Sequence, residues 1–263
     1  MILRVILKNF LSFNDEVQFD MFPNMKRTTL SNHITMLNEK LPVLKIYGAN
    51  GAGKSNLLKG INFLKAIALN KSFLDNDTFG KYIFALKENT GTEPMELTIE
   101  FETKTGIPYI YSVEIMNTGI VSEILQISGL GSEENHNVFT RKEGKIEYAV
   151  TPSEEVGNMV LGWIEKNPFS SLLTINNDMP VLTDENISIA QKWFEDELTI
   201  IGLHSFNPAL IGIFKSNKEI NQFASDIFKV LGLGINRVNV ETENFEDWMS
   251  THDISNLPMD KLK

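Results

Sequence analysis

The sequence has 263 residues, of which 42% are hydrophobic and 22% are charged, as expected for a globular protein that can bury a sizeable core. It contains no cysteine, which excludes disulfides and thiolate metal sites and favours a reducing, cytoplasmic setting. The net charge of −10 and the presence of only four arginines disfavour direct nucleic-acid binding by this chain, and no apolar run is long enough to span a membrane.

The first part of the chain predicts a hairpin followed by a strand–loop–helix unit. Residues 2–7 and 17–22 are predicted to form two strands joined by a turn, and residues 24–40 are polar and loop-like. The apolar run VLKIY at 43–47 then predicts a strand. Apolar residues at helical spacing predict an amphipathic helix over residues 54–69.

The residues between this strand and this helix, GANGAGKS at 48–55, have the spacing of a phosphate-binding loop. Gly51 and Gly53 let successive backbone N–H groups point at one phosphate, and the helix N-terminus adds partial positive charge. Lys54 is expected to reach the β- and γ-phosphates, and the hydroxyl of Ser55 is expected to bind Mg²⁺. We therefore predict a site for a nucleotide and Mg²⁺ formed by Asn50, Gly51, Ala52, Gly53, Lys54, Ser55 and Asn56.

The alternative is that GANGAG is only a flexible turn before a lysine. The strand and helix expected on either side favour the phosphate loop. A GTPase would also need an Asn-Lys-x-Asp sequence, but the Asn-Lys pairs at 70–73 (NKSF) and 217–220 (NKEI) lack the aspartate. A small-molecule kinase would need a lid with several arginines. The whole chain has only four arginines, and both of these classes are therefore disfavoured.

The middle of the chain predicts an antiparallel meander from about residue 95 to 150. In MELTIEF at 95–101, apolar and polar residues alternate as in a half-buried strand, and further short strands follow with turn-forming residues between them. From residue 153 onward the pattern predicts helices at 153–166, 184–198 and 218–233. One more strand is expected at 235–242.

The expected fold is α/β, with a P-loop NTPase-type strand–loop–helix core, an antiparallel β-meander and a C-terminal helical lobe. Residues 1–150 are expected to form the core lobe with the phosphate loop and the antiparallel meander. Residues 151–243 are expected to form a mostly helical lobe, and residues 244–263 a polar tail.

Three parts of the sequence carry a family resemblance: Asn9, Phe10 and Phe13 in the first turn, residues 47–58, and VFTR at 138–141. The chain resembles the ABC/SMC-type ATPase heads, and specifically bacterial AAA-type ATP-binding proteins related to the overcoming-lysogenization-defect nucleases and abortive-infection ATPases. The resemblance implies ATP and Mg²⁺ held between two subunits, and hence a homodimer through the heads. It also implies a DNA-related or phage-defence role with an effector or nuclease partner.

The same resemblance implies an aspartate for Mg²⁺ and an adjacent glutamate for the attacking water, at the end of a buried strand. The nearest match is MPVLTDE, which ends in Asp184 and Glu185, but Pro180 lies inside it and its apolar run is short. The simpler interpretation is that Thr183 or Asp184 caps a helix beginning near Glu185. No Ser-Gly-rich signature is present either, so no catalytic residue is predicted.

By these omissions the chain looks like the N-terminal part of a longer head, with ATP hydrolysis only if the missing groups are supplied elsewhere. The alternative is a non-hydrolysing nucleotide-binding module that docks a partner.

Two more residues have two interpretations each. Gln126 is either a Mg²⁺-sensing glutamine or a solvent-facing strand residue. Arg141 either contacts a phosphate or adenine edge, as the resemblance suggests, or pairs on the strand surface with a nearby glutamate such as Glu143.

Overall fold

The computed structural model describes residues 1–22, 44–70, 73–86, 92–201, 208–232, 234–239 and 244. The chain divides into two compact units, Met1–Ile200 and Ile201–Lys263, and each is considered by itself. The domain boundary expected at residue 150 falls inside the first unit. The expected polar tail lies outside the described residues, apart from Asn244.

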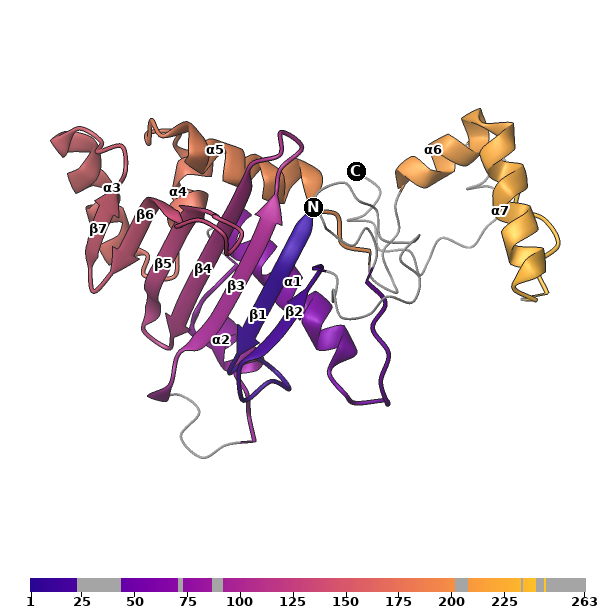
Figure 1. Ribbon diagram of the computed structural model, residues 1–263, viewed down its shortest axis with the longest axis horizontal. Helices are drawn as coiled ribbons and strands as arrows, with labels where there is room; N and C mark the ends of the chain where they lie inside the picture. The colour runs from indigo at the N-terminus through magenta and orange to yellow at the C-terminus, as the bar shows by residue number, and fades with distance from the viewer. Residues whose placement is uncertain are drawn as a thin grey trace. The chain divides into compact units, whose positions relative to one another are not determined.

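The first unit is built on a seven-stranded sheet with the order β2-β1-β3-β4-β5-β6-β7, in which neighbouring strands are antiparallel (Figure 1). The strands are β1 (Ile2–Lys8), β2 (Val17–Asp20), β3 (Met95–Glu102), β4 (Pro108–Met116), β5 (Gly119–Ile127), β6 (His136–Lys142) and β7 (Lys145–Tyr148). In β4, every second residue from Tyr109 to Ile115 is buried, so one face of the strand contributes to the core. The predicted meander is confirmed.

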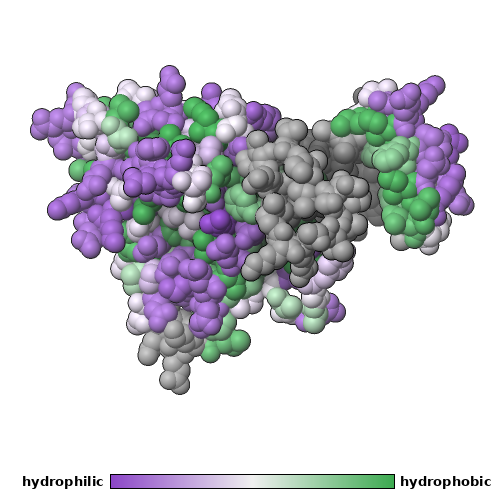
Figure 2. All heavy atoms as spheres, viewed as in Figure 1, coloured by the Kyte–Doolittle hydropathy of each residue, from purple (hydrophilic) through white to green (hydrophobic). Residues whose placement is uncertain are grey.

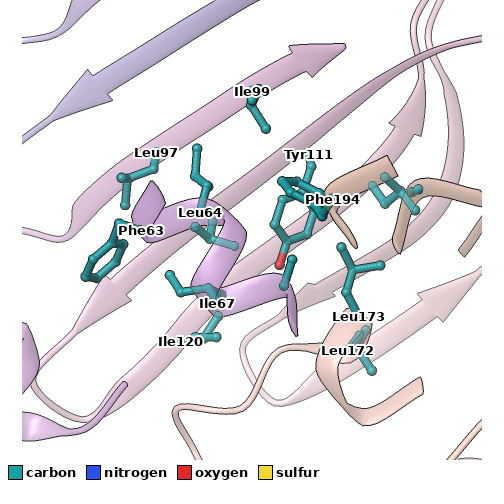
Figure 3. Close-up of a cluster of buried hydrophobic side chains, with 14 of the residues drawn as sticks. Phe63, Leu64, Ile67, Leu97, Ile99, Tyr111, Ile120, Leu172, Leu173 and Phe194 are labelled. Atoms are coloured by element: carbon teal, nitrogen blue, oxygen red, sulfur yellow. The ribbon is translucent and has the colours of Figure 1, made fainter. Parts of the chain in front are cut away.

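Helices cover one face of this sheet and enclose the core. They are α1 (Lys54–Leu69), α2 (Asn76–Tyr82), α3 (Glu154–Lys166), α4 (Leu172–Asp178), α5 (Glu185–Lys192) and the short π-helix η3 (Trp193–Glu197). Side chains of α1, β3, β4, β5, α4 and η3 meet in one cluster (Figure 3), which includes Phe63, Leu64, Ile67, Leu97, Ile99, Tyr111, Ile120, Leu172, Leu173 and Phe194. Each of these side chains is buried.

The glycine at position 60 explains why α1 can lie so close to β1. A Cβ atom on Gly60 would be 2.8 Å from Cδ1 of Leu7. Any larger residue would force either the buried Leu7 side chain or the helix to shift. The predicted amphipathic helix at 54–69 is confirmed, with its apolar stripe on the sheet.

The second unit contains α6 (Pro208–Ser216) and α7 (Lys218–Val230), which pack against each other. Asn217 separates them, and its side chain caps α7 by accepting hydrogen bonds from the amides of Glu219 and Ile220. The strand expected at 235–242 is not formed in the part that the structure describes, residues 235–239.

The mixed α/β fold class is confirmed, but the strand expected just before the phosphate loop is not formed in its described part. Residues 44–47 form no strand, and Tyr47 is 84% exposed. A buried strand needs ladder partners, and none of the strands in the described part of the chain pairs with this segment. Residues 172–178 form α4. In the same described part, no helix is long and apolar enough to cross a bilayer.

Candidate functional site

The glycine-rich loop turns sharply just before α1. Gly51 and Gly53 have φ angles of 83° and 87°, in the left-handed region that favours glycine. A Cβ on Gly51 would meet open space, whereas one on Gly53 would lie 2.8 Å from Oγ of Ser12 and 3.0 Å from Cε1 of Phe13. Gly51 is therefore required by backbone conformation alone, and Gly53 by both conformation and close packing.

Lys54 closes the loop from inside. Its Nζ donates hydrogen bonds to the carbonyl oxygens of Gly48, at 2.6 Å, and Ala49, at 2.7 Å. The ammonium group is therefore held over the loop, where an anion would also lie. Phosphate oxygens are stronger acceptors for this group than neutral carbonyls, so they can replace the carbonyls as its partners.

The N-terminus of α1 faces the same space. Gly53 is the N-cap and offers no side-chain acceptor, and the first turn contains no acidic residue. The helix dipole is therefore not compensated locally by a carboxylate. A concavity of about 250 Å³ lies over this end, lined by the seven residues predicted from the sequence: Asn50, Gly51, Ala52, Gly53, Lys54, Ser55 and Asn56.

These residues fit the phosphate part of MgATP. The two left-handed glycines, the uncompensated helix N-terminus and the Lys54 ammonium all favour an anion here. The exposed hydroxyl of Ser55 is a hard oxygen donor of the kind that Mg²⁺ binds. No carboxylate lines the concavity, so in the described residues Ser55 is its candidate Mg²⁺ ligand.

The turn between β1 and β2 forms one wall of the loop. Oγ of Ser12 accepts a hydrogen bond of 2.9 Å from Nδ2 of Asn56, in the first turn of α1. The ring of Phe13 lies beside Gly53. Sequence reasoning singled out Phe13 but missed Ser12, because a serine in a polar turn gives no signal of a contact with a residue so far along the chain.

Asn9 and Phe10 hold this turn in place. Asn9 has a φ of 52°, and its buried side chain donates to the carbonyl oxygens of Glu93 and Pro94. Phe10 is fully buried and packs edge-on against Phe63 of α1. Their role in the structure is therefore to position the turn.

Asp184, the candidate Mg²⁺ ligand of the expected acidic strand, caps a helix instead. Its Oδ1 accepts hydrogen bonds from the backbone and the side-chain amides of Asn186 in the first turn of α5. Glu185 is exposed in that same turn. Of the two caps considered from the sequence, Thr183 and Asp184, the structure uses Asp184.

The contacts of Asp184 place it at the other end of the sheet from the phosphate loop. Asn186 accepts a hydrogen bond from Tyr109, which is level with Ile2 at the start of β1 through the register of β3. Ser12, which touches the phosphate loop, follows the end of β1 at Lys8. The two acids are therefore not brought to the loop.

Arg141 is buried, and its expected contact with a phosphate or adenine edge is wrong; it does pair with a glutamate, but not on the strand surface. It pairs with Glu123 on the neighbouring strand, at 3.5 Å, rather than with Glu143 or with the phosphate loop. It also donates to the carbonyl oxygens of Ser170, at 2.7 Å, and of Ile120 and Pro168. Arg141 therefore ties β5 and β6 to the segment that leads into α4.

Glu123 completes this buried group. It accepts hydrogen bonds from the hydroxyl of Tyr111 and from the backbone amide of Leu172 at the start of α4. Burial raises the pKa of Glu123 above its usual range, while Arg141 acts in the opposite direction. Burial and the nearby Glu123 carboxylate raise the pKa of Tyr111 well above its ordinary value. The group is fully enclosed, and its partners are all structural.

Gln126 lies on β5 and accepts a long hydrogen bond of 3.4 Å from Asn135. Through Ile110 and Glu100 its register leads to Arg4, toward the start of β1. Gln126 therefore lies at a distance from the phosphate loop. It is partly exposed, which agrees with its interpretation as a solvent-facing strand residue.

Comparison with known protein families matches residues 44–180 to the family described as "AAA domain, putative AbiEii toxin, Type IV TA system". The match spans slightly more than half of the chain and includes the whole phosphate loop. The chain belongs to this AAA-domain family. No match was found among curated proteins.

Membership in this family assigns the protein to the P-loop ATPases of AAA type. The matched part of the AAA domain runs from the segment before the loop through α4 and includes the buried Arg141 group. It does not include the β1–β2 hairpin, so the contact between Ser12 and Asn56 joins a matched to an unmatched part of the chain.

Proposed function

We propose that this AAA domain binds MgATP at the concavity over α1, as the nucleotide-binding head of an ABC/SMC-like ATPase that pairs head to head. Gly51 and Gly53 shape the loop, Lys54 binds the β- and γ-phosphates, and Ser55 contributes its hydroxyl to Mg²⁺. Bound Mg²⁺ neutralises phosphate charge and orients the phosphate groups. Asn50, Ala52 and Asn56 complete the lining.

The observation that carries the proposal is the position of Lys54. Its ammonium group lies within 2.7 Å of two carbonyl oxygens of the loop, beside a helix N-terminus without an acidic neighbour. A lysine that merely followed a flexible turn would extend into solvent. An inward lysine at a positively polarised helix end is the arrangement expected of a phosphate site.

Calorimetric titration of the full chain with MgATP tests the proposal. Lys54→Ala should weaken binding by about 10- to 100-fold, since a charge-assisted hydrogen bond contributes roughly 1.5–3 kcal/mol. Lys59→Ala removes an exposed lysine from the same helix and serves as the matched control, which should bind as the wild type does. Wild-type affinity in Lys54→Ala would show that the nucleotide does not use this loop.

The second candidate function is a nucleotide-binding module that docks a partner without hydrolysing ATP. It is favoured by the position of Asp184, which caps α5 rather than facing the loop. An ATP-turnover assay separates the two. Turnover by the chain alone that disappears in Lys54→Ala would exclude the docking module, whereas binding without turnover would leave hydrolysis dependent on groups outside the described residues.

We place this activity in a cytoplasmic toxin or abortive-infection system, with an effector or nuclease as partner. The family description and the absence of cysteine support this placement. Head-to-head pairing predicts that MgATP increases the fraction of dimer in the wild type but not in Lys54→Ala. Sedimentation velocity with and without MgATP measures this difference directly.

A further inference from the structure

An apolar stripe runs along the exposed side of α7. Ile220, Phe223, Ile227 and Val230 are all exposed, with Phe223 at 66% and Val230 at 86%. The helix is strongly amphipathic, and hydrophobic and hydrophilic residues occupy opposite sides of this unit (Figure 2). Within the described residues of this unit, nothing buries these four side chains. Isolated apolar side chains are common on surfaces, but a continuous stripe indicates an interaction site.

The spacing of the stripe is that of a coiled-coil seam. Its members are separated by three, four and three residues, so Ile220 and Ile227 occupy one core position of a heptad and Phe223 and Val230 the other. The side chains between them that do pack within the unit lie on a different face: Ser225 is buried and bonded to the amide of Val238. The seam is therefore left open while the back of the helix is held.

The charges beside the seam favour a second copy of α7 in parallel orientation. Glu219 and Asp226 flank one side of the stripe, and Ala224 and Leu231 flank the other. In a parallel pair, each acid faces an uncharged position of the partner helix, whereas an antiparallel pair would place Glu219 opposite Asp226. β-branched isoleucines at the first core position also suit two parallel strands.

We propose that α7 pairs with α7 of a second copy of this chain, in parallel and in register, through Ile220, Phe223, Ile227 and Val230. An isologous contact of this kind closes as a two-fold dimer. The seam has only two heptads, so the pairing is weak by itself. Because both units belong to one chain, it raises the effective concentration of one phosphate-loop unit near another without needing nucleotide.

Sedimentation equilibrium of the full chain without nucleotide tests the pairing. The wild type should dimerise with a dissociation constant in the micromolar range or weaker. Phe223→Glu should raise this dissociation constant about tenfold or more, because it places a charge in the seam. Gln222→Glu adds the same charge on the neighbouring, exposed position outside the seam and should leave the dimer unchanged. Lys54→Ala should also dimerise as the wild type does, so failure of the nucleotide site and failure of this pairing can be distinguished.

Cross-linking tests the orientation, since the chain contains no cysteine that would interfere. Ile220→Cys places identical sulfurs opposite each other in a parallel, in-register pair and should form a disulfide-linked dimer in mild oxidant. Gln222→Cys should not. In an antiparallel pair residue 220 would lie opposite residue 230 of the partner, so Ile220→Cys would cross-link only together with Val230→Cys.

Three outcomes would overturn the proposal. The wild type could remain a monomer throughout the concentration range. The dimer could persist unchanged in Phe223→Glu. Finally, Phe223→Glu could lower the unfolding free energy of the monomer by as much as it lowers the free energy of dimer dissociation. That result would show that the stripe is covered by another segment of the same chain.

Discussion

Ser12 and Asn56 join the β1–β2 turn to the first turn of α1 through a hydrogen bond of 2.9 Å. This contact fixes the wall of the phosphate loop from outside, whereas Lys54 holds it from inside. Removing either side chain should loosen the loop. It would leave the charged group that is expected to bind phosphate, the Lys54 ammonium, in place.

Ser12→Ala is expected to weaken MgATP binding about fivefold, since a neutral hydrogen bond contributes roughly 1 kcal/mol. Asn56→Ala should have a similar effect, and the double variant should be little worse than either single one, because both remove the same bond. Asn62→Ala, on the exposed side of the same helix, is the control. Fully additive losses in calorimetry would show that the two residues act separately.

The two left-handed glycines are expected to differ in tolerance to alanine. Gly51→Ala should cost about 1–2 kcal/mol of unfolding free energy, because its Cβ meets open space and only the backbone conformation is unfavourable. Gly53→Ala should cost more, because its Cβ would also collide with Ser12 and Phe13. Urea unfolding of both variants measures the difference, and equal losses would contradict the close packing at Gly53.

Arg141→Met should destabilise the protein by about 3–5 kcal/mol, because it leaves the carboxylate of Glu123 buried without its ion-pair partner. Lys142→Met, at the adjacent exposed position of β6, should have little effect. The double variant Glu123→Leu/Arg141→Met should recover part of the loss. A double variant as unstable as the sum of the single ones would contradict the pairing.

The loss in Arg141→Met should also depend on pH. Burial raises the folded-state pKa of Glu123 above its ordinary value of 4.5, so the folded protein keeps this proton to higher pH than the unfolded chain. The stability contributed by this group is therefore present below pH 4.5 and is lost as pH rises through the folded-state pKa. Without Arg141 this pKa rises further, so the difference in unfolding free energy between variant and wild type should shrink as pH is lowered towards 4.5. A constant difference would be contrary to this expectation.

Tyr109 and Tyr148 provide a matched pair for alkaline titration. Burial raises the pKa of each from 10 to about 12, so the stability that their neutral forms contribute is complete below pH 10 and is lost as pH rises to 12. Tyr109→Phe should cost about 1 kcal/mol at neutral pH, because it removes the hydrogen bond to Asn186. Tyr148→Phe should cost nothing, because the hydroxyl of Tyr148 has no hydrogen-bond partner in the described structure. Tyrosinate absorbance and urea unfolding report the two effects separately.

The parts of the fold that could be predicted are those whose signal is local. The alternation in β3 and β4 and the helical spacing of α1 depend on residues close together in sequence. The phosphate loop is also local, since its seven lining residues are contiguous. For the same reason a helix cap at Thr183 or Asp184 could be predicted from the neighbouring residues, although the structure was needed to choose Asp184.

The parts that could not be predicted depend on contacts between distant residues. Arg141 faces Glu123 because of the register of β5 and β6, and no local pattern specifies that register. Residues 172–178 form a helix because Ser171 caps it and Glu123 accepts its first amide, although their composition resembles a short strand. Ser12 meets Asn56 only after β1 and α1 have packed together.

The carbonyl oxygen of Ile67, near the end of α1, accepts hydrogen bonds from the hydroxyls of Ser171, the N-cap of α4, and of Thr174 within α4. Together with the contact between Asn56 and Ser12, this anchors both ends of a helix about 24 Å long. A helix held at both ends cannot tilt without breaking the hydrogen bonds at one of them. Arrival of a phosphate should therefore be accommodated by reorientation of one flexible side chain, that of Lys54, while the helix beneath it stays still.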